Sequence, residues 1–519
     1  MHKIVTVVAV GCVTVITAAC GNSSAKAPTA PPTPAYTATF EQSACPWPLP
    51  AGQKQDGVRC GFVVVPENRA KPEGRQVRLA IAVFKATAAT GVLDPVVRLN
   101  GGPGASDVKY LADYTVENGK PTQDRHDIVF LDQRGTGLSE PSLQCPEWQD
   151  ILISSLAENL RADEDAARAN AALLKCHDRL APDGVDFSAY NSAASASDVV
   201  DVMSALGYGD YSIYGVSYGT RLALTVMRDH PEHVRSVVLD STVPLQVNGL
   251  SAKAKDFEGA LNTLFDGCNA DAACHAAYPN PAQDFFDLVA KLNSEPVIVE
   301  PQDPATKKTA RVVVNGDRLV EGTFQALYDT QLIPVLPFAL EQIAHGNLAL
   351  LNVLAEHAVF QFSDISWGMF TSVNCHEETL FNTEETVAQA NKDVRKEIVD
   401  AAPGRGVTSS AALQRELDLC KAWGAGTADA RENDAVSSDI PTLVFADEYD
   451  PITPPAWGAL AAQTLSHSYV VEFPATGHGA LSGQYACAAS IMAAFRENPS
   501  KQPDTSCAAA IPPPKFQVP

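Results

Sequence analysis

The chain has 519 residues, of which 45% are hydrophobic, and it carries a formal net charge of −23 at pH 7. A chain of this length can form two to three domains, and its apolar content is ample for a large buried core. The negative charge argues against nucleic acid and against anionic membrane surfaces as partners.

The N-terminus has the pattern of an export signal. A histidine and a lysine precede an apolar run at positions 4–19 that is too short to span a bilayer comfortably. We therefore interpret residues 1–19 as a signal peptide. Cys20 follows Thr-Ala-Ala as in a bacterial lipobox, which predicts a lipid anchor on the outer face of the cell membrane. Because Thr17 stands where leucine is usual, plain cleavage and secretion are the alternative.

The body of the chain has the strand pattern of an α/β protein. Two strand-like runs, 59–66 and 76–86, flank a polar turn and predict an opening hairpin. Further buried strands are expected at 95–99, 127–132, 211–214, 235–240, 442–446 and 468–473. Helical patterns separate them, so we expect an α/β fold with a mostly parallel sheet of about eight strands.

One long insertion interrupts this pattern between the strands at 235–240 and 442–446. It is mostly helical, with helices expected at 254–266, 281–292, 332–343, 383–399 and 411–423. An insertion of this length above the strand C-termini would cover an active site as a lid. The predicted organisation is a flexible linker at 20–38, a core at 39–244 and 436–519, and a helical cap at 245–435.

A nucleophile is predicted at Ser217. Residues 211–220 are Tyr-Ser-Ile-Tyr-Gly-Val-Ser-Tyr-Gly-Thr, so a short strand leads into G-x-S-x-G and then into a helix. That order is the nucleophile elbow of an α/β-hydrolase, where a sharp turn exposes the serine hydroxyl. The alternative is a glycine-rich turn with an ordinary serine, but the helix, strand, elbow, helix and strand around it favour the elbow.

A serine hydroxyl is a poor nucleophile at its normal pKa, so it needs a base and an orienting acid. In α/β-hydrolases the acid and then the base follow the nucleophile along the chain. Asp450 follows a late strand in a turn stiffened by two prolines, and His478 lies between two glycines after the last strand. We predict a triad of Ser217, His478 and Asp450. Asp447 and Glu448 are the other carboxylates here, and we interpret them as solvated loop charges. His467 precedes the last strand, so it lies at the wrong end of the sheet to be the base.

The oxyanion hole must present backbone N–H groups to the developing negative charge. One donor is expected from Tyr218, the residue after the nucleophile, and another from the loop after an early strand. Residues 100–104 of that loop are Asn-Gly-Gly-Pro-Gly, whose glycines let the backbone approach a substrate. Gly102 is the predicted second donor, and Gly101 is the alternative.

Ten of the twelve cysteines remain once Cys12 and Cys20 are assigned to the leader and the anchor. An even number in an exported chain predicts disulfides. We expect sequential pairing, because each pair then closes a local loop at low entropic cost. The expected pairs are Cys45–Cys60, Cys145–Cys176, Cys268–Cys274, Cys375–Cys420 and Cys487–Cys507. A metal site is the alternative, but no C-x-x-C or H-x-x-x-H spacing supports it, and no cofactor is predicted.

Five motifs occur along the chain: Asn-Gly-Gly-Pro-Gly at 100–104, Asp-Gln-Arg-Gly-Thr-Gly at 132–137, Gly-Val-Ser-Tyr-Gly at 215–219, Asp-Pro-Ile-Thr-Pro at 450–454 and Gly-His-Gly at 477–479. Together they resemble the prolyl iminopeptidase and tripeptidyl aminopeptidase family of α/β-hydrolases, above all its secreted tripeptidyl aminopeptidases. The resemblance implies a serine exopeptidase that acts on a free N-terminus. Asn100 stands where many prolyl iminopeptidases carry histidine. This difference argues against a specificity for proline, but it does not affect the backbone N–H groups of the oxyanion hole.

An aminopeptidase must bind a cationic α-amine, so carboxylates are expected to face its cleft. Glu377 and Glu378 are the candidates, because a disulfide at Cys375 would hold them in place. The alternative for both is a solvated acidic turn. Arg134 is expected to order the loop beside the oxyanion hole without touching the substrate.

The predicted function is a serine aminopeptidase, of the tripeptidyl type, that acts on peptide or protein N-termini through an acyl-enzyme. Two alternatives stay open. One is a carboxylesterase or lipase of the cell envelope, because a triad does not choose between ester and amide. The other is a non-catalytic envelope lipoprotein that keeps the fold for binding.

Overall fold

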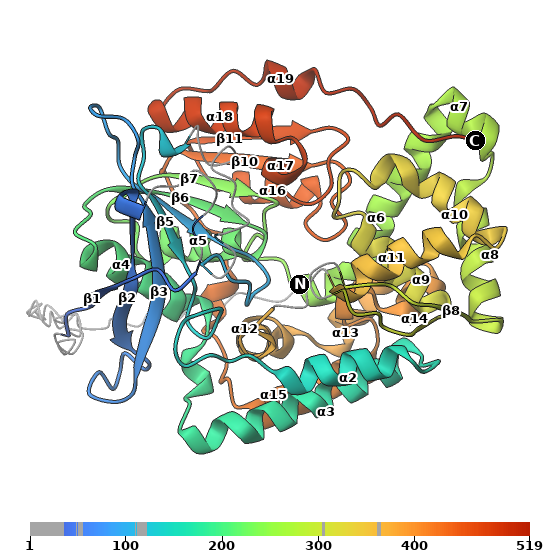
Figure 1. Cartoon of the computed structure of the whole chain (residues 1–519), viewed down its shortest axis with the longest axis horizontal. Helices are drawn as coiled ribbons and strands as arrows, with labels where there is room; N and C mark the ends of the chain where they lie inside the picture. The colour runs from blue at the N-terminus through green and yellow to red at the C-terminus, as the bar shows by residue number, and fades with distance from the viewer. Residues whose placement is uncertain are drawn as a thin grey trace, which may run out of the picture. The chain divides into compact units, whose positions relative to one another are not determined.

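The structure is a computed structural model that describes residues 36–47, 49, 55–108, 111, 122–303, 307–360 and 365–519 (Figure 1). The predicted signal peptide, the lipidation site Cys20 and the predicted linker up to residue 35 lie outside these residues. Within the described ranges, no helix combines the length and the hydropathy that a membrane span requires.

The central sheet has nine strands in the order β1-β2-β3-β5-β4-β6-β7-β10-β11. They are β1 (Thr39–Ser43), β2 (Val58–Pro66), β3 (Gln76–Phe84), β4 (Val96–Leu99), β5 (Ile128–Leu131), β6 (Tyr211–Val216), β7 (Val234–Asp240), β10 (Thr442–Asp447) and β11 (Ser468–Phe473). Pairing is antiparallel from β1 to β5 along this order and parallel from β5 to β11. This strand order and the mostly parallel pairing are those expected for the predicted α/β-hydrolase fold. The additional strand, β1, has one large apolar residue in Thr-Phe-Glu-Gln-Ser, so its sequence does not mark it as a strand.

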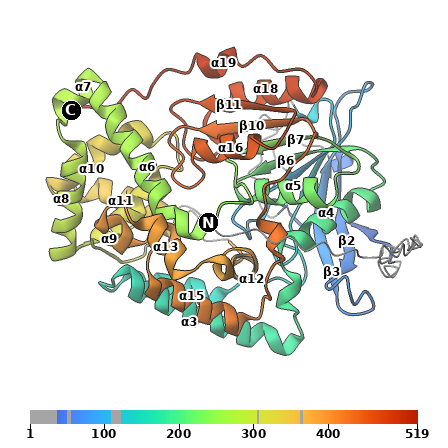
Figure 2. The ribbon, with the colours of Figure 1, turned by 180° about the vertical axis from the view of Figure 1, so that it is seen from behind.

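Helices cover both faces of the sheet. On β6, Ile213 packs with α4 (Ser192–Ala205) and α5 (Tyr218–Asp229), whereas the next residue, Tyr214, packs on the other face with α18 (Tyr485–Glu497). Figures 1 and 2 show these layers from two sides. Three shorter helices complete this part: α16 (Pro455–Ala462), α17 (Ala480–Gly483) and α19 (Ser506–Ala509). Strands that are buried on both faces have continuous apolar sequences, and this pattern allowed the inner strands to be predicted.

The cap lies between β7 and β10 in the chain (Figure 1). Its helices are α6 (Gly249–Ala270), α7 (Ala272–Ala277), α8 (Pro281–Ser294), α9 (Gly316–Ala326), α10 (Leu336–Ala344), α11 (Leu348–Phe360), α12 (Trp367–Glu377), α13 (Glu384–Asn391), α14 (Lys396–Ala401) and α15 (Ser410–Trp423). A small hairpin pairs β8 (Val297–Val299) with β9 (Val312–Val314). The single helix expected at 383–399 is instead two, α13 and α14. The break follows Asn391 and contains Asp393, and both residue types favour turns over helix interiors.

A second segment, between β5 and β6, packs with the cap helices. Helices α2 (Pro146–Leu156) and α3 (Ala162–Leu180) share a hydrophobic cluster with α12 and α15, and all four lie together in Figure 1. Trp148 of α2 stacks on Trp367 of α12 with ring centroids 3.8 Å apart. The predicted boundary assigned all of 39–244 to the core. Periodicity identifies a segment as helical, but it does not show which neighbour the helix packs against.

Five disulfides join the ten cysteines of the described ranges in sequential pairs, as expected: Cys45–Cys60, Cys145–Cys176, Cys268–Cys274, Cys375–Cys420 and Cys487–Cys507. Two of them lie in the cap, where they join α6 to α7 and α12 to α15. Such bridges persist in oxidising compartments and are rare in the cytosol.

Candidate active site

Ser217 lies in a tight turn between β6 and α5, with φ 56° and ψ −130°. Only glycine fits two residues before it and two residues after it. A Cβ atom on Gly215 would lie 2.5 Å from the carbonyl oxygen of Gly219, and one on Gly219 would lie 1.9 Å from that of Leu99. This close packing fixes the turn of a nucleophile elbow, and Ser217 lies at the wall of a large cavity.

Asp450 and His478 follow two neighbouring parallel strands, β10 and β11, and their side chains meet. His478 Nδ1 lies 2.8 Å from Asp450 Oδ2. The hydroxyl of Thr453 donates to the same Asp450 oxygen at 2.6 Å, and it lies 3.3 Å from His478 Nδ1. The backbone N–H groups of Ile452 and Thr453 donate to the other oxygen, Oδ1. The Asp-Pro-Ile-Thr-Pro turn therefore orients the carboxylate toward the imidazole.

The two side chains shift each other's pKa in the direction that catalysis needs. Burial alone would raise the pKa of Asp450, but His478 and the hydrogen bonds from Thr453 outweigh it, so that pKa lies below its usual value. Burial alone would lower the pKa of His478, but the charge and hydrogen bond of Asp450 raise it above its usual value. The imidazolium that forms when the base takes the serine proton is therefore stabilised.

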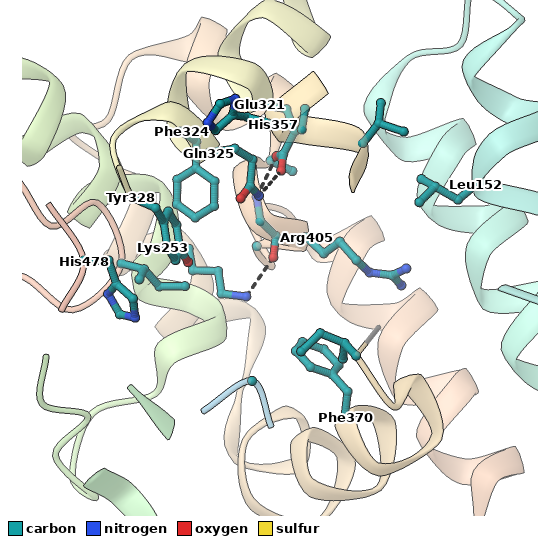
Figure 3. Close-up of a pocket in the computed structure, with 18 of the residues that line it drawn as sticks. Leu152, Lys253, Glu321, Phe324, Gln325, Tyr328, His357, Phe370, Arg405 and His478 are labelled. Atoms are coloured by element: carbon teal, nitrogen blue, oxygen red, sulfur yellow. Dashed lines mark hydrogen bonds between the residues drawn. The ribbon is translucent and has the colours of Figure 1, made fainter. Parts of the chain in front are cut away.

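Ser217 and His478 line the same cavity, which has a volume of about 1630 Å³. Helix α9 and the residues after it form one wall, shown in Figure 3 with Tyr328 beside His478. The ring centroids of Tyr328 and His478 are 4.7 Å apart, and the backbone N–H of His478 donates to the backbone carbonyl oxygen of Tyr328 at 3.1 Å. The cap thus contacts the predicted base directly.

The loop after β4 brings backbone against the nucleophile. A Cβ atom on Gly101 would lie 2.7 Å from the Cβ of Ser217, so no side chain fits there. The Gly101 N–H already donates to Asn100 Oδ1 at 2.8 Å, which favours Gly102 as the donor toward substrate. Tyr218 is the first residue of α5, so its N–H has no partner inside the helix. This geometry supports Gly102 and Tyr218 as the oxyanion hole.

Buried hydrogen bonds support this loop from behind. The Gln133 side chain donates to the Asn100 carbonyl oxygen at 3.0 Å. Arg134 is fully buried and donates to the two carboxylate oxygens of Asp198 at 2.7 and 2.6 Å. Arg134 does not line the cavity, and it also donates to the carbonyl oxygens of Glu67 and Ala189.

The expectation that Glu377 and Glu378 face the cleft is wrong, and so is the alternative of a solvated turn. Both side chains are buried and form ion pairs with the buried Arg221 of α5. Glu377 also accepts from the Ser192 hydroxyl at 2.7 Å, and neither glutamate lines the cavity. A buried arginine needs compensating charge, and these two carboxylates supply it while they tie α12 of the cap to the elbow helix.

The expectation that Asp447 is a solvated loop charge is also wrong. It ends β10, is fully buried, and accepts from the Ser241 hydroxyl at 2.9 Å. Asp240 on the adjacent β7 accepts from the Ala480 N–H at 2.8 Å. Burial, together with the nearby carboxylates, raises the pKa of Asp447 well above its usual value. These groups hold the backbone that follows His478, whereas Glu448 is exposed as expected.

Several site residues were not identified from the sequence. Thr453 could have been identified, because Asp and Thr side chains often form hydrogen bonds with groups a few residues away along the chain. Glu321 and Gln325 of α9, which line the cavity, are spaced i, i+4 and were therefore predictable as a pair. Periodicity alone did not show that this helix face turns toward the catalytic residues.

Among the described residues, ligand-type atoms come close enough for a metal ion at one place, Cys145, Glu147 and Cys176. The two cysteines form a disulfide there, so their sulfurs are not thiolates. This group therefore does not have the chemistry of a metal site.

Comparisons with known proteins agree with this geometry. A family model described as alpha/beta hydrolase fold matches residues 94–271, and one described as TAP-like protein matches residues 407–507. Serine protease Hip1 of Mycobacterium tuberculosis is 26% identical over 442 residues, which cover 81% of this chain and 82% of that protein. Tripeptidyl aminopeptidase of Streptomyces coelicolor is 31% identical over 356 residues, which cover 65% and 62%. Carboxylesterase B of Mycobacterium tuberculosis is 27% identical over 449 residues, which cover 84% and 83%.

The predicted catalytic residues fall inside the two matched segments. Ser217 lies in the first, and Asp450 and His478 lie in the second. The long stretch between the segments is the cap, which separates the nucleophile from the acid and base in sequence but not in space. The chain is therefore a serine hydrolase with an α/β-hydrolase fold, and the segment that holds the predicted acid and base is similar to TAP-like proteins.

Proposed function

We propose that this chain is a serine aminopeptidase that releases tripeptides from peptides with a free N-terminus. The observation that carries the proposal is the cavity, which is lined by Ser217 and His478 and walled by cap helices. A walled site suits an exopeptidase, because it receives the end of a chain and not its middle. The names of two relatives, serine protease and tripeptidyl aminopeptidase, support the same substrate class.

The proposed chemistry is acyl transfer in two steps. Ser217 Oγ attacks the scissile carbonyl while His478 takes its proton, and the N–H groups of Gly102 and Tyr218 stabilise the oxyanion. His478 then gives the proton to the leaving amine, and Asp450 holds the imidazole in place. Water hydrolyses the acyl-enzyme by the same route, with His478 again as the base.

The test compares a tripeptide p-nitroanilide that has a free α-amine with its N-acetylated counterpart and with a simple p-nitrophenyl ester. We expect strong cleavage of the unblocked anilide and weak cleavage of the acetylated one. Equal cleavage of the two anilides, or cleavage of the ester alone, would favour the carboxylesterase alternative that one relative's name suggests. Failure of a fluorophosphonate probe to label Ser217 would revive the non-catalytic alternative.

We also propose that the chain is exported and anchored through a lipid on Cys20. The five disulfides and the leader pattern at 1–19 support export. In a bacterial host, a Cys20→Ala variant should leave the membrane fraction, while a Cys12→Ala variant should stay in it. Retention of the Cys20→Ala variant in the membrane fraction would contradict the anchor.

A further inference from the structure

Glu321 places a carboxylate in the cavity wall without a cationic partner. Its side chain accepts hydrogen bonds from Gln325 Nε2 at 2.7 Å and from the Gly404 N–H at 2.8 Å, and both donors are neutral (Figure 3). Within the described part of the chain it makes no ion pair. By contrast, Asp317 in the same wall is paired with Arg161. Burial raises the pKa of Glu321, so a nearby positive charge would relieve an unfavourable anion.

Gln325 adds an acceptor that has no donor. Its side-chain orientation is determined, because a carboxylate only accepts and Nε2 must therefore face Glu321. Its Oε1 is buried and has no hydrogen-bond partner among the described residues, although Gln325 is only 5% exposed and lines the cavity. A buried acceptor without a donor is costly, so the site lacks a hydrogen-bond donor in this form.

The cations in this wall are directed elsewhere. Lys253 Nζ donates to the Gly404 carbonyl oxygen at 2.7 Å, and burial lowers the pKa of Lys253 to about 8. Arg405 pairs with Glu416 at 3.9 Å. Their positive field favours the ionised form of Glu321, but neither forms an ion pair with it in the described structure.

The spacing along α9 matches the length of a short peptide. Tyr328 contacts His478, and Glu321 precedes Tyr328 by seven residues, the first five steps within α9 and the last two in the turn that follows it. Five helical steps rise about 8 Å and the turn adds a few ångströms, so the two positions lie about 10 Å apart along the chain. Three residues of extended peptide also span about 10 Å. A group held at Glu321 would therefore lie about three residues from the catalytic end of the cavity.

We propose that the Glu321 carboxylate and Gln325 Oε1 bind the α-ammonium group of the substrate, and that their position along α9 sets a three-residue product. An ammonium group carries three N–H donors and one positive charge, which supplies what both side chains lack. The inference rests on the proposed aminopeptidase function. It assigns the residues that fix the distance from the substrate N-terminus to the cleaved bond.

The test measures kcat/KM for a tripeptide p-nitroanilide with a free α-amine and for its desamino analogue, in which hydrogen replaces the amine. Wild type should prefer the free amine. Glu321→Gln keeps an acceptor for the Gly404 N–H but removes the charge, so we expect the preference to fall by about 10- to 100-fold. Gln325→Leu removes the neutral Oε1 acceptor and the Nε2 donor to Glu321 but leaves the negative charge, so we expect a fall of about 2- to 10-fold. Fluorophosphonate labelling of Ser217 checks that each variant is folded.

A second readout is product length. With an unblocked decapeptide, mass spectrometry should show tripeptides released by wild type and a mixture of lengths released by Glu321→Gln. The matched control is Glu356→Gln, which removes a different carboxylate from the same cavity on α11 and should change neither readout.

The outcomes separate the two proposals. If wild type shows no preference for the free amine, the aminopeptidase function itself fails. If wild type prefers the free amine but Glu321→Gln and Gln325→Leu keep that preference and release only tripeptides, the assignment of this pair is overturned. A loss in Glu356→Gln as large as that in Glu321→Gln would also overturn it, because the general charge of the cavity would then explain the effect.

Discussion

Asp450 accepts hydrogen bonds from Ile452 N–H, Thr453 N–H, the Thr453 hydroxyl and His478 Nδ1. With both oxygens engaged, the carboxylate has one orientation. It holds the imidazole with the proton on Nδ1, which leaves Nε2 free to accept the serine proton. The residues that orient the acid therefore act on the nucleophile through the base.

Thr453→Val should lower kcat and leave KM nearly unchanged. The substitution keeps the shape of the side chain but removes the hydroxyl that donates to Asp450 at 2.6 Å. A hydrogen bond to a charged group contributes about 1.5–3 kcal/mol, so we expect kcat to fall by about 10- to 100-fold. Steady-state kinetics on the unblocked anilide measure it, and Thr453→Ser, which keeps the hydroxyl, is the control. Full activity in the valine variant would show that the other three hydrogen bonds suffice.

The pH profile of kcat/KM should report His478. The base acts when neutral, so activity falls as pH drops through its pKa, which Asp450 raises above the usual value of about 6.5. Asp450→Asn removes that contribution while burial still lowers the pKa of His478, so the acidic limb should move to lower pH. The rate should also fall by about 10⁴-fold. An ester substrate is needed, because a peptide α-amine titrates near pH 8. A limb that moves to higher pH would contradict the assignment.

At the scale of elements, the elbow depends on close contact between β6, α5 and β4. Gly219→Ala would place a methyl group 1.9 Å from the Leu99 carbonyl oxygen, so backbone must move. We expect a loss of about 1–3 kcal/mol in the free energy of unfolding, measured by urea denaturation, together with loss of activity. Gly259→Ala, in α6 with no atom within 4 Å of the new methyl, should be neutral or stabilising by up to about 1 kcal/mol. Equal effects of the two variants would rule out steric contact as the cause.

The strands could be predicted, and the proposed triad residues could be placed after them, because each has a local pattern. Buried parallel strands are short apolar runs, and Ser217, Asp450 and His478 each follow one of them. Packing partners have no local pattern. The acidic pair at Glu377 could not be matched with Arg221, which is 156 residues away in sequence. For the same reason, the helical character of α9 was no guide to the residues that its inner face contacts.

At the scale of the whole molecule, the disulfides should differ in their contributions to stability. In the chain-entropy account, a bridge stabilises more when it closes a longer loop. Cys375–Cys420 spans 45 residues, whereas Cys268–Cys274 spans 6. Replacing both cysteines by alanine should cost about 4 kcal/mol for the first pair and about 2 kcal/mol for the second. Urea unfolding of the two double variants tests this order, and a larger loss for the shorter loop would contradict it.

The cap and the catalytic part are joined at two places that matter for chemistry. Glu377 and Glu378 of the cap pair with Arg221 of the elbow helix, and the carbonyl oxygen of Tyr328 accepts the backbone N–H of His478. The base therefore takes part of its support from the cap. We therefore expect that the enzyme does not work without its cap. Excising residues 245–435 to make an open, broad-specificity esterase would remove the support of the base, and a cap transplanted from a relative would have to provide its own carbonyl in the place of Tyr328.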